Sequence, residues 1–227
     1  TVPAGSAAKA GFTGAKTVTE ENGETMTENF DAKWKLTGSD KLTVDAGGSV
    51  SNAHYDSRGA FLGAEVTEAG SGGVVVETAF DASWTVFERT YQGTMGNDTI
   101  SAAGGTNTLR GGSGSDTLTG GSGADKFVFN TVIGNGDVDT ITHFQPGTDE
   151  ILLDLDIFAG LGPVGKLDPS AFVHGSSAQA TDDRIVYDSQ SGSLYYDPDG
   201  SGAAPAILFG HVGNHALLRA DDFTVIL

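Results

Sequence analysis

The sequence predicts an all-β protein built around a parallel β-roll, or β-solenoid, with flanking β-sandwich-like strands. Three observations predict this fold: a nine-residue repeat in mid-chain, alternating apolar and polar residues after it, and 34 glycines against 6 prolines in 227 residues. Abundant glycine without proline indicates ordered tight turns rather than a disordered or collagen-like chain. We expect three parts: a β-rich region at 1–92, the roll at 93–128 and a C-terminal module at 129–227.

The repeat divides residues 93–128 into four blocks without insertion: GTMGNDTIS, AAGGTNTLR, GGSGSDTLT and GGSGADKFV. Position 4 is always glycine, position 6 is an acid or its amide, and position 8 is a large apolar residue. These positions are Gly96, Gly105, Gly114 and Gly123; Asp98, Asn107, Asp116 and Asp125; and Ile100, Leu109, Leu118 and Phe127. A glycine-rich linker has no reason to keep an apolar residue at every ninth position, so we reject that alternative.

The spacing within a block suits a cation that prefers oxygen ligands. Glycines permit backbone dihedrals that turn several carbonyl groups into one concave loop, and calcium takes six to eight oxygen ligands of this kind. The residue at position 8 faces inward and builds an apolar column. We therefore expect about two to four calcium ions, and the candidate ligand residues are Asp98, Asn107, Asp116, Asp125, Gly96, Gly112, Gly114, Gly121 and Gly123.

Successive loops should fall on opposite sides of the roll, so each ion should lie between blocks two apart. Asp98 then pairs with Asp116, and Asn107 pairs with Asp125. The second pair offers one carboxylate instead of two, and its first loop reads AAGGTN, so we expect the second site to bind more weakly.

The repeat resembles the glycine- and aspartate-rich nonapeptide of RTX proteins. After it, Asp139, Ile141, Phe144, Gly147, Asp149, Ile151 and Leu153 resemble the strand-turn-strand segment of the serralysin C-terminal domain, although His143 stands where that family usually has an acid. The later stretches DRIVYDSQSGSLYYDPDGSG and ILFGHVGNHALLRADDFTVIL are also similar to that domain, so the resemblance covers about residues 93–227. It implies that Asp139 is a further calcium ligand.

The same resemblance implies secretion. Residues 221–227 place two acids before an apolar tail. In the family that the chain resembles, such a tail is an uncleaved signal that a type I secretion exporter recognises. An ordinary closing strand is the alternative interpretation, and both can hold at once. We expect a secreted, extracellular or cell-surface protein that leaves the cytosol unfolded and folds outside with calcium.

Charge and composition limit the classes of molecule that the chain can bind. The chain has 12 Lys and Arg against 30 Asp and Glu, which disfavours nucleic acid and anionic membranes and favours multivalent cations. No apolar run approaches the length of a membrane span, so we expect no membrane insertion. The absence of cysteine excludes disulfides, thiolate metal sites and cysteine nucleophiles.

Two smaller motifs suggest further metal sites, a calcium loop and a zinc pair, but fit them poorly. The acidic turn from Asp197 to Gly200 departs from EF-hand spacing and predicts a hairpin turn. His211 and His215 have the spacing of a helical zinc pair, but Gly213 lies between them and no third ligand accompanies them. We interpret the two histidines as surface or packing residues.

The N-terminal region contains one duplication, since FDAKW at 30–34 recurs as FDASW at 80–84. We expect stacked β units that lead into the roll, with Trp34 and Trp84 as equivalent core residues. A carbohydrate-stacking surface is the alternative. Asp40 follows a Gly-Ser pair and is a candidate degenerate half-site for calcium.

Motifs for catalysis are absent from the sequence: it has no HExxH segment, no GxSxG elbow and no phosphate loop. Adjacent acids such as Asp182 and Asp183 alternate across a strand, which suits acid–base catalysis poorly. We expect no enzyme within this chain. Three roles remain: a structural, adhesive or self-associating extracellular protein; a non-catalytic export and folding tail of a larger secreted protease, lipase or polysaccharide lyase; or a module that binds extracellular glycans.

Overall fold

The computed structural model describes residues 14–19, 25–30, 36–44, 50–56, 58, 60–83, 85–102 and 104–227. The chain divides into two compact units, one of Thr1–Gly70 with Val76–Arg89 and one of Ser71–Val75 with Thr90–Leu227. Within the described ranges the secondary structure consists of β-strands and short 3-10 turns, so the fold is all-β as the sequence predicts. No helix in these ranges has the length and apolar character to span a bilayer.

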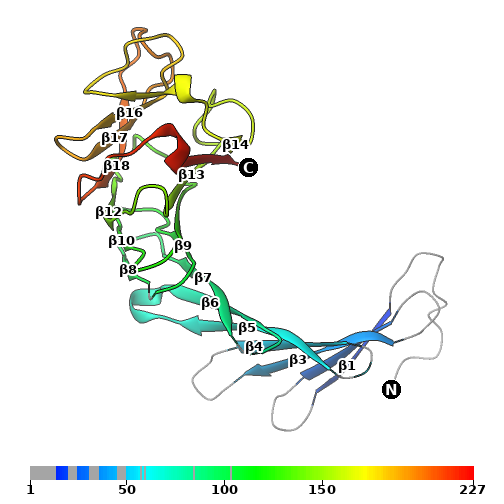
Figure 1. Ribbon diagram of the computed structural model, residues 1–227. Helices are drawn as coiled ribbons and strands as arrows, with labels where there is room; N and C mark the ends of the chain where they lie inside the picture. Colours follow the sequence, from blue (N-terminus) through cyan, green and yellow to red (C-terminus); the bar gives the residue numbers. More distant parts are fainter. Residues whose placement is uncertain are drawn as a thin grey trace. The chain divides into compact units, whose positions relative to one another are not determined.

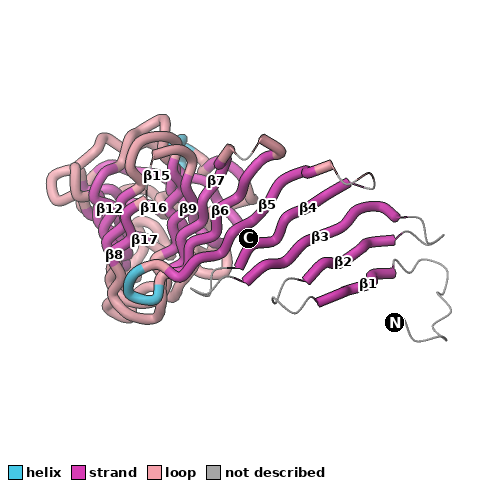
Figure 2. Tube along the Cα trace, turned by 90° about the horizontal axis from the view of Figure 1, so that it is seen from below, coloured by secondary structure: helices cyan, strands magenta, loops and turns pink. Residues whose placement is uncertain are grey.

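The first unit is an antiparallel meander. Its strands are β1 (Gly14–Thr19), β2 (Thr25–Phe30), β3 (Leu36–Val44), β4 (Val50–Asp56), β5 (Phe61–Ala69), β6 (Val75–Asp81) and β7 (Val86–Gln92). They follow one another in chain order, and Figure 2 shows them side by side in one layer. The described strands of this flank therefore form a single sheet rather than two facing sheets.

The FDAxW duplication marks two equivalent hairpins. Phe30 is the last residue of β2 and Phe80 the last but one of β6, and the next strand begins six residues after each of them, so β2–β3 and β6–β7 correspond. In the second copy, Asp81 Oδ1 accepts hydrogen bonds from the backbone N–H groups of Ser83 at 2.8 Å and Thr85 at 3.0 Å. This side chain starts the turn, as aspartate often does. Trp34 and Trp84, and with them the carbohydrate-stacking alternative, lie outside the described residues.

Asp40 does not lie in a loop. It pairs with Thr27 of β2 on one side and with His54 of β4 on the other, in the middle of the antiparallel sheet. Because a calcium half-site of the repeat type needs a turn whose carbonyl groups converge, the expectation of a half-site at Asp40 is wrong.

The second unit contains two sheets. One has the order β9 (Asn107–Arg110), β11 (Asp125–Phe129), β13 (Glu150–Asp154), β19 (Phe223–Ile226) and β14 (Gly165–Lys166). The other has the order β15 (Phe172–His174), β16 (Ile185–Asp188), β17 (Ser193–Tyr196), β18 (Ile207–Val212), β12 (Asp139–His143), β10 (Thr117–Thr119) and β8 (Thr99–Ser101). From β8 to β13 the chain alternates between the sheets, so each nonapeptide makes half a coil. Figure 1 shows β8, β10 and β12 stacked on one side, with β9 and β13 on the other.

The apolar residues at position 8 form the column that their spacing predicts. The parallel register sets Ile100 beside Leu118, and Leu109 beside Phe127. It continues past the repeats, where Leu118 pairs with Ile141. All of these side chains are at most 2% exposed. Burial of each contributes about 1.5–3 kcal/mol, so the column is the hydrophobic core of the roll.

Beyond the roll, two sheets face each other through aromatic side chains. The ring of Phe129 in β11 lies 5.1 Å from that of Phe209 in β18, and Phe209 lies 5.0 Å from Phe158. Phe172 in β15 contacts Phe223 in β19 at 5.4 Å. This flank has the sandwich-like packing that the sequence predicts.

Both smaller motifs lie on this flank. The turn from Asp197 to Gly200 connects the antiparallel strands β17 and β18, so it is the predicted hairpin turn. His211 lies in β18 opposite Ser193, and His215 follows the strand. The two histidines are therefore not on a helix.

Candidate metal centre

The glycine loops of neighbouring coils pack backbone against backbone. Gly112 has φ 98°, and a Cβ atom there would lie 2.0 Å from Thr94 O. Gly114 has φ 110°, and its Cβ would lie 2.7 Å from the carbonyl carbon of Gly96. A side chain at either position is excluded both by the left-handed backbone and by lack of space. Gly121 (φ 89°) and Gly123 (φ 120°) have the same left-handed conformation in the next loop.

Gly96 differs from the other glycines predicted to line the sites. It has no positive φ, and the nearest atom to a Cβ built on it is 3.9 Å away. The structure therefore gives no steric reason for glycine at this position, although its carbonyl group faces Gly114 of the next coil.

Aspartate side chains connect the coils in two rows. In the first row, which we call the β8-side ladder, Asp98 N donates to Asp116 Oδ1 at 2.7 Å and Asp116 N donates to Asp139 Oδ1 at 3.0 Å. Blocks two apart thus lie together, as their spacing predicts.

The second row, the β9-side ladder, follows the same pattern on the opposite side of the roll. Asn107 N donates to Asp125 Oδ1 at 3.1 Å, and Asp125 N donates to Asp149 Oδ1 at 3.1 Å. The Asn107 side-chain amide also donates to Asp125 Oδ1, at 2.7 Å. Asn107 therefore gives this oxygen two hydrogen bonds and contributes no charge.

The middle carboxylates of the two ladders are buried with one oxygen unsatisfied. Asp116 and Asp125 are each 1% exposed, and their Oδ2 atoms have no hydrogen-bond partner. Each Oδ2 atom faces the loop of its own repeat. A Cβ atom added to Gly111 would lie 2.2 Å from Asp116 Oδ2, and one added to Gly120 would lie 2.4 Å from Asp125 Oδ2. A buried carboxylate oxygen without a partner is costly unless a cation compensates it.

Two of the three outer carboxylates, those of Asp98 and Asp149, accept hydrogen bonds from the protein through Oδ2. Asp98 Oδ2 accepts hydrogen bonds from Thr94 N at 2.6 Å and Thr94 Oγ1 at 2.9 Å. Asp149 Oδ2 accepts one from Gln145 N at 2.9 Å. Among the described carboxylates, the buried oxygens without a hydrogen-bond partner are therefore Asp116 Oδ2 and Asp125 Oδ2.

Burial makes four of the five ladder carboxylates poor anions unless a cation is bound. Burial raises the pKa of Asp139 to about 7, and repulsion by Asp116 and Asp137 adds to this effect. Burial also raises the pKa values of Asp116, Asp125 and Asp149. Nearby positive charge favours the ionised form, so a cation would reverse these shifts.

Side chains alone do not complete a coordination shell. Among the described residues, no group of three or more His, Cys, Asp or Glu side chains could hold a metal ion. Carbonyl groups of the glycine loops would have to supply most of the six to eight oxygen ligands that calcium takes. The arrangement of loops, with glycine where backbones meet and a buried carboxylate at the end, fits this demand.

Two acids near the ladders escaped the sequence-based list of ligands. Asp137 Oδ2 accepts hydrogen bonds from Gly114 N at 3.1 Å and from Asn135 Nδ2 at 2.7 Å. Asp149 was named in the sequence only as part of the segment that resembles the serralysin C-terminal domain. In the structure it is the last carboxylate of the β9-side ladder. The stretch NGDVD carries a glycine–acid signal, but the step between coils has lengthened there from 18 to 23 residues, so a nine-residue register misses it.

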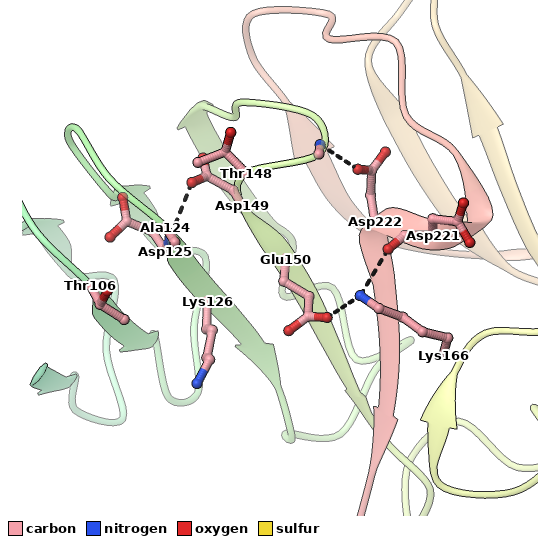
Figure 3. A pocket seen from close by; sticks show the side chains of 11 residues that line it. Thr106, Ala124, Asp125, Lys126, Thr148, Asp149, Glu150, Lys166, Asp221 and Asp222 are labelled. Carbon is pink, nitrogen blue, oxygen red and sulfur yellow. Dashed lines mark hydrogen bonds and ion pairs between the residues drawn. The ribbon is translucent and has the colours of Figure 1, made fainter.

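A cavity of about 210 Å³ lies at the end of the β9-side ladder (Figure 3). Asp125 and Asp149 line one part of it, and Asp221 and Asp222 another. Lys166 Nζ donates to a Glu150 carboxylate oxygen and, at 2.9 Å, to Asp221 O. This is where the ladder meets a distant segment of the chain.

Comparison with known proteins agrees with the geometry of the repeats. The family of RTX calcium-binding nonapeptide repeats matches residues 92–127 in four copies. No curated protein matches the chain. Among solved structures, the AlgE6R3 subunit of the Azotobacter vinelandii mannuronan C5-epimerase is similar at 24% identity over 60% of this chain and 77% of that chain, with a TM-score of 0.31. Residues 92–127 therefore consist of four RTX calcium-binding nonapeptide repeats.

Proposed function

We propose that the chain is a secreted module that calcium folds outside the cell, with about two to four ions held between loops of the roll. One observation carries this proposal: Asp116 Oδ2 and Asp125 Oδ2 are buried without a hydrogen-bond partner. Asp98, Asn107, Asp139 and carbonyl groups of the loops at Gly96, Gly112, Gly114, Gly121 and Gly123 would complete the sites.

Calcium at these loops would contribute a large share of the stability. At ten times its dissociation constant, each ion that binds only the folded state adds about 1.4 kcal/mol. A few such sites approach the stability of a whole domain, about 5–15 kcal/mol. The RTX repeat is a non-catalytic calcium-binding module, and this role requires no chemistry beyond the binding of the ion.

Native mass spectrometry of the full chain tests the number of sites. We expect about two to four calcium ions to remain bound after desalting, and fewer in the double variant Asp116→Asn, Asp125→Asn. The same number of ions in the variant and the natural sequence would mean that these carboxylates are not ligands.

Export through a type I secretion exporter is the route we propose. It is supported by the RTX repeats and by the acid–apolar sequence of residues 221–227. In a host that carries a matching exporter, deletion of residues 223–227 should trap the chain inside, whereas Asp116→Ala should still be exported and fold poorly outside. Normal export of the deletion variant would place the signal elsewhere.

The biological role that we propose for the folded module is structural or adhesive. The antiparallel meander of the first unit offers a sheet through which copies can associate. A non-catalytic tail of a larger secreted enzyme and a glycan-binding module are the alternatives. The intact mass of the secreted protein separates the first two roles, light scattering measures self-association, and glycan-array binding tests the third.

A further inference from the structure

Residues 134–139, which we call the exit loop, follow the repeats on the β8 side and differ from the repeat loop at 111–116 by one residue. Each of the two loops has two glycines with positive φ, separated by one residue. In the repeat loop the ladder aspartate comes two residues after the second glycine, whereas in the exit loop it comes three residues after Gly136. The exit loop therefore carries two acids, Asp137 and Asp139, where a repeat loop carries at most one.

Both acids of the exit loop accept hydrogen bonds from the same repeat loop. Asp116 N donates to Asp139 Oδ1 at 3.0 Å, and Gly114 N donates to Asp137 Oδ2 at 3.1 Å. Asn135 orients Asp137, because its Nδ2 donates to Asp137 Oδ2 at 2.7 Å and its Oδ1 accepts from Asp137 N at 3.0 Å. Asp137 Oδ1 accepts no hydrogen bond from the described residues, so this oxygen is available to a cation.

Three carboxylates, those of Asp116, Asp137 and Asp139, therefore gather between the two loops. Asp116 Oδ2 is buried without a hydrogen-bond partner, and Asp139 is 8% exposed. Burial raises the pKa values of Asp116 and Asp139, and repulsion by the Asp137 carboxylate adds to both effects. Within the part of the chain that the structure describes, none of the three forms an ion pair with lysine or arginine. Such a group of negative charges needs a cation to compensate it.

The other candidate sites along the ladders offer fewer carboxylates. Asp98 and Asp116 bring two, and Asp98 Oδ2 already accepts two hydrogen bonds within its own loop. Asp125 and Asp149 also bring two, whereas Asn107 and Asp125 bring one. Because the number of charged ligands tunes the affinity of a protein site for calcium, the place with three carboxylates should bind the ion most tightly.

We propose that the tightest calcium site of the roll lies between the loop at 111–116 and the exit loop, with Asp137 as its third carboxylate ligand. Half of this site lies beyond the four repeats at residues 92–127. Carbonyl groups of the two loops supply the remaining oxygen ligands. Calcium fills this site before it fills the site at Asn107. The inference rests on the proposed calcium binding and adds to it a further ligand and an order of filling.

Calcium titration of the full chain in competition with a fluorescent chelator measures the affinity of the tightest site. Asp137→Asn keeps an acceptor oxygen for Gly114 N but removes the charge. This variant should weaken the tightest site about tenfold or more, which corresponds to about 1.4 kcal/mol. Asp156→Asn is the matched control, because it removes one charge from an exposed side chain that belongs to neither ladder. The control should bind calcium as tightly as the natural sequence.

Hydrogen exchange, followed by mass spectrometry as calcium is added, locates the site and needs no variant. In the natural sequence, the exit loop should become protected at a lower calcium concentration than residues 104–107. If residues 104–107 are protected first, or if Asp137→Asn weakens binding no more than Asp156→Asn does, the inference is refuted while the calcium function stands. If the natural sequence takes up no calcium, the proposed function itself is refuted.

Discussion

At the scale of single residues, charge separates the roles of Asp116 and Asn107. Asp116 contacts two neighbouring coils, because its Oδ1 accepts from Asp98 N and its own N–H donates to Asp139. Its Oδ2 has no protein partner. Asn107 occupies the same position in its block but supplies only neutral hydrogen bonds to Asp125. A cation should therefore interact far more strongly with Asp116 than with Asn107.

We expect Asp116→Ala to raise the calcium concentration needed for folding about tenfold or more, equivalent to about 1.4 kcal/mol. Asn107→Ala should have a smaller effect, since no charge is lost. Calorimetric titration of both variants with calcium measures the difference. Equal losses would show that the two ladders are not distinguished by charge.

The glycines allow a steric test with an internal control. Gly112→Ala should destabilise the calcium-bound protein by about 1–3 kcal/mol or more, because φ is 98° and the added methyl group would meet Thr94 O. Gly96→Ala should be tolerated, because φ there is not positive and no atom lies within 3.9 Å of the added carbon. Urea denaturation in saturating calcium compares them. Similar losses would mean that loop packing does not explain the glycines.

At the scale of elements, the ladder carboxylates predict a pH dependence for the calcium-free protein. Burial, followed by the charges of Asp116 and Asp137, raises the pKa of Asp139 from 3.8 to about 7. The folded state then binds more protons than the unfolded state between about pH 4 and 7, so stability falls as pH rises through that window. In calcium-free buffer, the β signal measured by circular dichroism should therefore be larger at pH 6 than at pH 8. A signal that is unchanged or larger at pH 8 would contradict the burial of uncompensated carboxylates.

The sequence predicted the elements of the repeats more fully than those that follow them. Within 93–128 the repeat length is constant at nine residues, which places Leu109 beside Phe127 and Asp98 beside Asp116. The neighbours of each residue can therefore be predicted from its position in the repeat alone. Past the repeats the steps lengthen to 23 and 24 residues, which hides the part that Asp137 and Asp149 play. From the sequence, residues 221–227 could be an export signal, a closing strand or both. Strand β19 confirms the prediction of a closing strand. Its place between β13 and β14 depends on pairing that no local pattern encodes.

At the scale of the whole molecule, the two units differ in what holds them together. The first unit is an antiparallel meander whose strands pair with neighbours in sequence. The second depends on parallel pairing across long sequence separations and on carboxylate ladders that require a counter-charge. The dependence of stability on calcium should therefore be concentrated in the second unit. The duplicated hairpins of the first unit should contribute little to this dependence.

Circular dichroism of the full chain with and without chelator tests the central claim most directly. Addition of EGTA should remove a large part of the β signal, and excess calcium should restore it, because the roll cannot bury Asp116 and Asp125 as anions without a cation. Magnesium at the same concentration should restore less, since it prefers a rigid octahedral shell and keeps its water. A spectrum and a melting temperature unchanged by chelation would contradict the claim that calcium folds this protein.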